Sequence, residues 1–178
     1  PAFGLAEEIL AGTRLPVVVS GGIATGQGLV DALAIGASGV QCGTAFLATG
    51  ESFAHPYHKA RVVAATGGDT VLTDVFVLNW PKGAAVRVIA NSVTNGLDGR
   101  FLGHDPAALP REAIAWDDDQ PRLRFSTDSP LRTTTGDLEA MALYAGQGAG
   151  SIRDIPPAAA RLAAMVAEAR RIMIGGTA

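Results

Sequence analysis

Residues 15–44 constrain the fold of this chain more than any other stretch, because two short apolar segments in it each end at glycine. The first segment, Leu15–Val19, is rich in β-branched residues and too short for a buried helix, which predicts a strand of a parallel sheet. Gly21 and Gly22 follow it. Glycine permits positive φ and has no Cβ, so backbone N–H groups at this turn are open to a ligand.

A helix and a second strand complete the unit. Apolar residues at 29, 30, 33 and 34 share one helical face, and Gly36 is a helix stop. The segment Gly39–Cys42 predicts another strand, and Gly43 and Thr44 form the turn that follows. The order strand, loop, helix, strand, loop predicts an α/β fold.

Ligands of such sheets bind at the carboxyl ends of the strands. Two neighbouring strands that end in glycine would place open N–H groups side by side, at the start of helices whose dipoles favour an anion. In an eight-stranded α/β barrel the loops after the last two strands form a phosphate site of this kind. One hypothesis is that Gly21, Gly22, Gly43 and Thr44 hold the phosphate of a nucleotide-like cofactor; the alternative is that they only make tight turns.

A dinucleotide site of the doubly wound type is disfavoured. Gly26 and Gly28 supply a G-x-G, but Asp31 stands where the third glycine is required. The second strand ends in Gln41 and Cys42, and neither is the acidic residue that would bind a ribose.

Several motifs in a fixed order resemble the nitronate monooxygenase family, also described as 2-nitropropane dioxygenase-like flavoproteins. The resemblance runs from about Leu15 to Met173. Its motifs are VVVSGGIATGQGLVDALAIGASGVQCGTAFLAT at 17–49, Glu51-Ser52 with AHPYHK at 54–59, DTVLT at 69–73 and AGQGAG at 145–150.

The resemblance implies an FMN-dependent (β/α)8 barrel. Gly21 and Gly22 match the first phosphate loop of the family, and the second flavin-contacting segment is matched by Gln41, Cys42, Gly43 and Thr44. Position 42 varies in the family pattern, so Cys42 would contribute backbone and not thiol chemistry.

Family members are much longer than this chain. We therefore expect the chain to be the carboxyl-terminal part of the barrel, with the catalytic residues in an amino-terminal half outside it. The expected division is 1–66 for the last two barrel strands with the FMN phosphate site, 67–135 for a substrate or lid subdomain, and 136–178 for carboxyl-terminal helices that pack on the barrel.

The implied reaction is the oxidation of alkyl nitronates by O2 to a carbonyl compound and nitrite, with FMN as cofactor. One alternative on the same fold is an NAD(P)H-dependent flavin reductase of quinones or enoyl thioesters. Another is a non-catalytic fragment or binding module. The expected partners are the small-molecule substrate, O2, the other half of the barrel and a second copy of the chain.

Composition excludes several other classes. The formal net charge is −3, which argues against a nucleic-acid partner, and a single cysteine excludes an intrachain disulfide framework. We find no Cys/His cluster of the zinc type, no apolar run of membrane-spanning length and no secretory signal. The expectation is therefore a cytoplasmic protein without a metal.

Downstream of the glycine unit, the pattern predicts a helix that starts at Pro56 and extended chain over 69–78 and 86–89. The segment 91–132 is rich in proline and carries an acidic run at 117–119, so we interpret it as an insertion over the barrel mouth. A long surface loop over 96–127 is the alternative.

Two further helices are predicted near the carboxyl end, over 137–144 and 155–174. The glycine-rich segment 146–150 lies between them. It either approaches the flavin or its substrate or is a flexible joint between helices, and the absence of a preceding strand favours the joint.

The histidines are the obvious acid/base candidates. His55 and His58 lie three apart at the start of a predicted helix, but a metal site needs more ligands, and we favour structural roles for both. His104 is expected in a turn. Arg87 would either pair with an anionic substrate or be solvated or salt-bridged, the second being favoured. Cys42 has no neighbouring histidine and is not a credible nucleophile.

Overall fold

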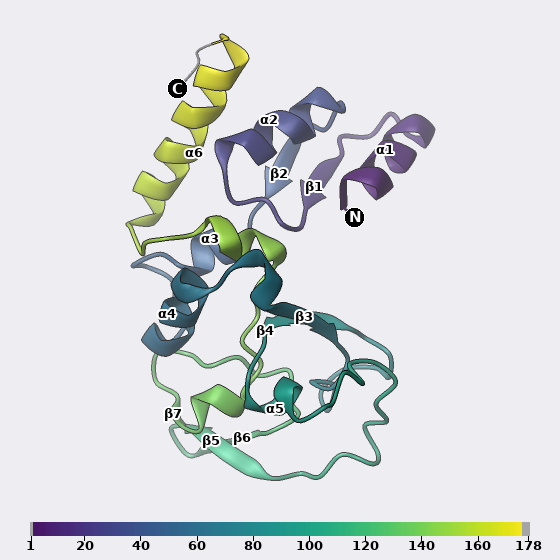
Figure 1. The fold of residues 1–178 in the computed structure, drawn as a ribbon, viewed down its shortest axis with the longest axis vertical. Helices are drawn as coiled ribbons and strands as arrows, with labels where there is room; N and C mark the ends of the chain where they lie inside the picture. Colours follow the sequence, from purple (N-terminus) through teal and green to yellow (C-terminus); the bar gives the residue numbers. More distant parts are fainter. Residues whose placement is uncertain (1, 176–178) are drawn as a thin grey trace.

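The computed structural model describes residues 2–175, and its amino-terminal part is a parallel β-α-β unit. Helix α1 (Ala2–Gly12) precedes β1 (Val18–Ser20), α2 (Gly26–Ala34) and β2 (Gly39–Gln41). The two strands pair in parallel, and α2 forms the crossover between them (Figure 1). The predicted α/β unit is confirmed.

A small apolar cluster holds this unit together. The side chain of Val19 in β1 is 2% exposed, whereas its neighbour Val18 is 56% exposed. Only one face of β1 is therefore covered by the described chain. The buried members of the cluster are Ala6, Val19, Ile23, Ala32 and Ala37.

The segment that follows β2 connects the β-α-β unit to the rest of the chain. It consists of the short helix α3 (Thr44–Leu47) and of α4 (Pro56–Ala64). Pro56 begins α4 as predicted, and the side chain of His55 accepts a hydrogen bond from the backbone N–H of Tyr57. A free first-turn N–H is thereby satisfied.

The extended segment predicted over 69–78 forms a strand only in its first half. After the 3₁₀ turn η1 (Gly67–Asp69), β3 (Thr70–Thr73) pairs antiparallel with β4 (Val86–Ile89). The prediction for 86–89 is confirmed.

The segment 91–132 is more regular than we expected. After α5 (Ser92–Asn95), β5 (Ala113–Asp117) and β6 (Gln120–Leu123) form an antiparallel hairpin, and β7 (Thr135–Gly136) adds to β5. The acidic run at 117–119 is the turn of this hairpin. Asp117 is itself 9% exposed and accepts hydrogen bonds from Arg122 and Thr134, so it is not part of a solvated acidic patch.

The helix predicted over 137–144 is wrong. Only one 3₁₀ turn forms, η2 (Leu138–Ala140), and the chain after it is extended. Ile89 donates its backbone N–H to the carbonyl oxygen of Leu143 (2.8 Å), and Val88 forms a β-bridge with Tyr144. The free edge of β4 bonds these residues, so tertiary pairing overrides local helix propensity.

The last helix, α6 (Ala158–Met173), is confirmed within the predicted range 155–174 and follows the 3₁₀ turn η3 (Gln147–Ser151). Met165 and Ala169 are buried, whereas the apolar side chains of Leu162 and Met173 are 54% and 65% exposed. The buried face packs on α2.

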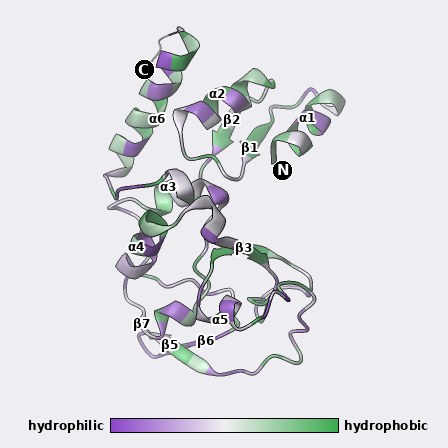
Figure 2. Ribbon diagram, in the orientation of Figure 1, coloured by the Kyte–Doolittle hydropathy of each residue, from purple (hydrophilic) through white to green (hydrophobic). Residues whose placement is uncertain are grey.

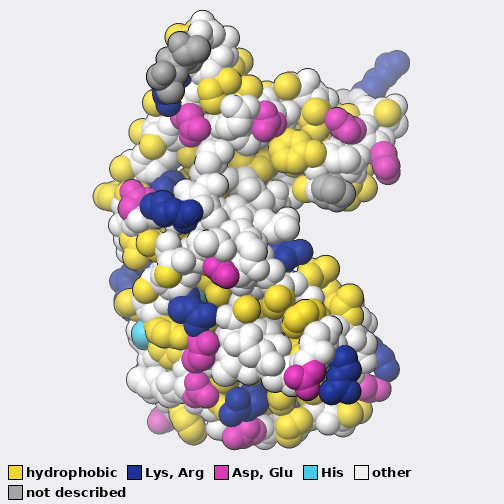
Figure 3. Space-filling view, in the orientation of Figure 1, with side chains coloured by type: hydrophobic (Ala, Val, Ile, Leu, Met, Phe, Trp, Pro, Cys, Tyr) yellow, Lys and Arg dark blue, Asp and Glu magenta, His cyan; other side chains and the backbone are white. Residues whose placement is uncertain are grey.

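The elements gather into an upper and a lower part in Figure 1, with α3 and η3 between them. The upper part contains the β-α-β unit, α1 and α6, and the lower part contains β3 to β7. Hydrophobic segments lie along the strands of both parts and alternate with hydrophilic ones along α6 (Figure 2). The surface is hollowed between the two parts (Figure 3). Within residues 2–175, no helix combines the length and apolar character needed to cross a membrane.

Candidate functional site: a glycine-lined cradle and a larger cavity

The two glycine turns lie side by side at the carboxyl ends of β1 and β2. Gly21 and Gly22 have φ values of +118° and +74°, a backbone region that side chains rarely adopt. The parallel pairing of Ser20 with Gln41 brings the turn after β1 next to the turn containing Gly43. Together these turns line a cavity of about 170 Å³, which we call the cradle. It is lined by Gly21, Gly22, Ile23, Gln41, Gly43, Thr44, Gly146 and Gly148.

The third wall of the cradle comes from η3, more than a hundred residues further along the chain. The backbone N–H of Gly146 donates to the hydroxyl oxygen of Thr44 (2.9 Å). A Cβ on Gly148 would lie 2.6 Å from the carbonyl oxygen of Gly22, so only glycine permits this approach. The segment 146–150 is therefore a wall of the site and not the flexible joint that we favoured, because it packs against the first glycine turn.

The amides of the cradle are available to a ligand. Within residues 2–175, the backbone N–H groups of Gly22, Gly43 and Thr44 donate no hydrogen bond to the chain, and both glycines are exposed. The hydroxyl of Thr44 accepts from Gly146 and keeps its own O–H to donate. Gly146 has no side chain, and a Cβ there would lie 3.6 Å from the nitrogen of Gly22. This donor set fits a phosphoryl group.

The helix dipole has a smaller role than the sequence suggested. The N-cap Thr25 accepts from Gly28, and the carboxylate of Glu168 in α6 accepts from Gly26 (2.8 Å), so protein oxygens already occupy the start of α2. An anion in the cradle would be held by turn amides instead. Gly26 and Gly28 lie inside α2 and serve packing, which agrees with the rejection of a dinucleotide site.

Of the six residues predicted to bind the cofactor, the structure places five around the cradle. The exception is Cys42, which packs against two of the apolar clusters and does not line the cavity. Burial raises the pKa of its thiol, which favours the protonated form. This agrees with the prediction that Cys42 is not a nucleophile.

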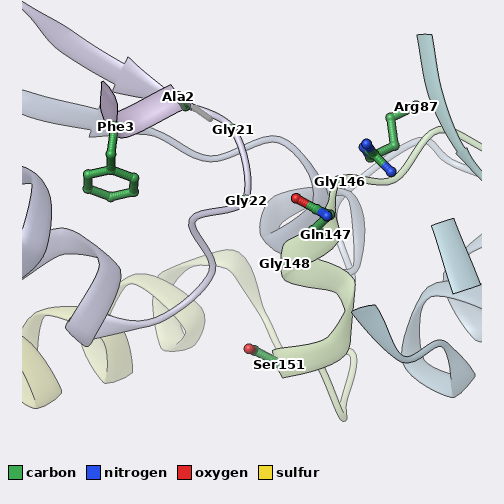
Figure 4. A pocket seen from close by; sticks show the side chains of 9 residues that line it. All are labelled: Ala2, Phe3, Gly21, Gly22, Arg87, Gly146, Gln147, Gly148 and Ser151. Carbon is green, nitrogen blue, oxygen red and sulfur yellow. The ribbon is translucent and has the colours of Figure 1, made fainter. Parts of the chain in front are cut away.

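A larger cavity of about 540 Å³ lies beside the cradle and shares Gly21, Gly22, Gly146 and Gly148 with it. Figure 4 shows Arg87 on one side of this cavity, with Phe3 across from it. Among the lining residues that the structure describes, Arg87 is the only charged one. Of the remaining lining residues, Ala2, Phe3 and Ser151 were not predicted from the sequence. Gln147 belongs to the segment 146–150, for which an approach to the flavin or its substrate was the alternative that we did not favour.

None of the three histidines lines either cavity. His55 caps α4, and His104 contacts the carboxylate of Asp74 through Nδ1 (2.6 Å) in a loop of the lower part. His58 is fully buried, with Nε2 3.0 Å from the carbonyl oxygen of Tyr144 and Nδ1 3.2 Å from the hydroxyl of Ser129. Burial lowers the pKa of His58 to about 4, so the ring is neutral and its role is structural.

Comparison with known proteins gives one consistent family. The nitronate monooxygenase family model matches residues 2–168. Nitronate monooxygenase of Pseudomonas aeruginosa is 31% identical over 172 residues, which covers 94% of this chain and 43% of that protein.

Two solved structures share the backbone arrangement. Nitroalkane oxidase from Streptomyces ansochromogenes has a TM-score of 0.71 and 30% identity, covering 97% of this chain and 44% of that one. FabK from Thermotoga maritima also has a TM-score of 0.71, with 27% identity, covering 97% of this chain and 50% of that one. The chain spans about two fifths of the length of the curated relatives that it matches over most of its own sequence.

Proposed function

Because this chain belongs to the nitronate monooxygenase family, we propose that it forms the cofactor-binding part of a flavin-dependent oxidoreductase that oxidises alkyl nitronates with O2. The products would be a carbonyl compound and nitrite. In this proposal β1 and β2 are the last two strands of a (β/α)8 barrel, and the lower part of the molecule is the substrate-facing subdomain.

The observation that carries the proposal is the cradle. Gly22, Gly43 and Thr44 line this space together with Gly146, and within residues 2–175 their three backbone amides donate to no other group of the chain. The Thr44 hydroxyl adds a further donor at the same wall. Such a set of donors suits the terminal phosphoryl oxygens of FMN, since each oxygen accepts from amide hydrogens without a nearby carboxylate to repel it. When bound there, the flavin supplies electron transfer from the nitronate to O2.

The residues of this chain hold and orient the cofactor. Thr44 has two roles, because its hydroxyl fixes the amide of Gly146 while its O–H remains a donor toward the cradle. A methyl group at position 146 would contact the nitrogen of Gly22 at 3.6 Å and would cover this amide in part. The larger cavity next to the cradle has an apolar side formed by Ala2 and Phe3, which suits the flat faces of an aromatic ring system.

The experiment compares FMN with riboflavin, which lacks the phosphate. Flavin fluorescence titrations are made on the wild type, Gly146→Ala and Thr44→Val. We expect both variants to weaken FMN binding by roughly 10- to 100-fold, the range for losing hydrogen bonds to a charged group, and to leave riboflavin binding unchanged.

Two matched controls accompany these variants. Thr44→Ser keeps the hydroxyl, and Gly39→Ala adds a methyl group in β2 where a Cβ would meet nothing within 4 Å. Both should bind FMN as the wild type does. Equal affinity for FMN and riboflavin in the wild type would refute the phosphate cradle.

A second candidate function is an NAD(P)H-dependent flavin reductase of quinones or enoyl thioesters. The observation in its favour is that the chain superposes equally well on a nitroalkane oxidase and on FabK, two enzymes of different name. Nitronate-dependent O2 uptake, measured against NAD(P)H oxidation on the purified protein, separates the two. Absence of any bound flavin would instead favour a non-catalytic module.

A further inference from the structure

Arg87 lies in the wall of the larger cavity because side chains along β4 point alternately to opposite faces. Val86 and Val88 are buried in the lower core at 8% and 0% exposure. Successive side chains of a strand point to opposite faces, so Arg87 is directed away from that core. Figure 4 shows its guanidinium group turned toward Gly146 and Gln147.

The position of Arg87 is fixed relative to the cradle. Its carbonyl oxygen accepts the backbone N–H of Ala145 (3.2 Å), the residue immediately before Gly146. On the other side of the strand, Arg87 lies opposite Leu72 in the β3–β4 register. The strand that carries the arginine and the turn that forms the cradle wall are thus hydrogen-bonded to each other.

The charge of Arg87 has no counterion in the described chain. Its Nη1 donates to the carbonyl and hydroxyl oxygens of Thr70, both at 3.2 Å, and both acceptors are neutral. Among residues 2–175, no carboxylate forms an ion pair with this guanidinium group. A guanidinium group that lines a cavity without an ion-pair partner is available to an anionic ligand, which would supply the opposite charge. Of the two roles favoured from the sequence, a salt-bridged arginine is therefore not supported, and a solvated one stays a prediction.

Arg87 and the turn amides of the cradle belong to two different cavities of the site. Gly43 and Thr44 line only the cradle, whereas Arg87 and Gln147 line only the larger cavity. An anion bound by Arg87 would therefore lie in the larger cavity, beside the cradle and not in it.

We propose that Arg87 is a substrate-binding residue that recognises a planar monoanion with two oxygens, namely the NO2 group of a nitronate or the carboxylate that has the same shape. A guanidinium group presents two parallel N–H donors that match such a group, and within residues 2–175 Nε and Nη2 of Arg87 donate no hydrogen bond. The choice of nitronate as the natural ligand rests on the proposed function; the recognition of a two-oxygen anion does not.

Binding measurements on the FMN-loaded protein test this site without turnover. Isobutyrate is the carboxylate analogue of propane-2-nitronate, and isobutyramide is its neutral analogue of the same shape. Calorimetric titration of isobutyrate should show binding roughly 10- to 100-fold weaker in Arg87→Gln than in the wild type, with isobutyramide binding unchanged. Arg87→Lys should lie between them, because the charge remains while the two-pronged geometry is lost.

Controls separate this role from folding and from cofactor binding. Arg111→Gln removes one positive charge from an exposed position in the segment 91–132 and should bind isobutyrate as the wild type does. The affinity for FMN should be the same in all four proteins. In kinetics, Arg87→Gln should raise KM for the nitronate.

Three results would overturn the proposal. These are equal weakening of isobutyrate and isobutyramide, loss of FMN affinity with anion binding retained, and no isobutyrate binding by the wild type. Isobutyrate binding that depends on Arg87, in a protein without nitronate-dependent O2 uptake, would support this site and refute the proposed function.

Discussion

The carboxylate of Glu168 in α6 accepts the backbone N–H of Gly26 at the start of α2, at 2.8 Å and across 142 residues of sequence. At the same point the helices are in backbone contact. A Cβ on Gly26 would lie 2.5 Å from both the nitrogen of Ala169 and the carbonyl oxygen of Met165. This contact anchors the end of the loop that begins with Gly21 and Gly22.

Gly26→Ala should therefore destabilise the protein, because the new methyl group overlaps backbone atoms that cannot move aside. We expect a loss of about 1–3 kcal/mol in the free energy of unfolding, measured by urea denaturation. Gly4→Ala is the matched control, since it adds a methyl group in α1 where a Cβ would meet nothing within 4 Å. That variant should be neutral or more stable by up to about 1 kcal/mol. Equal stability of the two variants would contradict the helix contact.

His58 should make stability depend on pH. Burial lowers its folded pKa to about 4 from the usual histidine value of 6.5, so between these values the unfolded state binds more protons than the folded state. Stability therefore rises with pH across this window and falls as the solution is acidified, by roughly 3 kcal/mol in total. Urea midpoints measured between pH 4 and pH 7 give the slope.

His58→Gln removes the titrating group while its amide can still donate to Tyr144. The variant should be less stable at pH 7 and should show a smaller slope between pH 4 and pH 7. Glutamine in place of the partly exposed His55 is the comparison that should retain the slope. An unaltered slope in His58→Gln would show that the His58 ring does not cause the pH dependence of stability.

Asp74 should control the order of the loop at 101–104. Its buried carboxylate accepts from the backbone N–H groups of Gly103 (2.8 Å) and His104 (3.2 Å). Burial raises the pKa of Asp74, but the hydrogen bonds from His104 and Gly103 outweigh it and lower the pKa below its usual value. The stabilisation is therefore present near neutral pH and is lost as the pH falls through that lowered pKa.

Asp74→Asn should destabilise the protein by about 1–3 kcal/mol, the range for hydrogen bonds to a charged group. Hydrogen exchange should increase at Gly103 and His104. Asp98→Asn replaces an exposed aspartate at φ +49°, a conformation that asparagine tolerates, and should change stability by less than about 0.5 kcal/mol. Unchanged exchange at Gly103 in Asp74→Asn would contradict the anchoring role.

Local signals were sufficient for the β-α-β unit and for both glycine turns. The glycine pair Gly21-Gly22 follows a β-branched run and adopts positive φ, and Gly43 follows the second short apolar segment, so both turns could be assigned before any contact was known. The end of α2 at Gly36, with φ +96°, follows from the same local rule.

Elsewhere the local sequence pattern was not sufficient, because contacts between segments far apart in the sequence decided the structure. The segment 137–144 has helical periodicity, but the edge of β4 takes Leu143 as a hydrogen-bond partner and extends the chain. His58 is spaced like a ligand, yet it lies buried between α4 and the backbone of Tyr144.

The sequence by itself determined the two strand tips and the glycines that expose their amides, because those properties depend on neighbouring residues only. Tertiary structure alone decided that Gly146 and Gly148 close the cradle and that Arg87 faces the cavity without a counterion. Both outcomes depend on strand pairing and close backbone packing between segments many residues apart. A local sequence pattern does not indicate which distant segments will pack together.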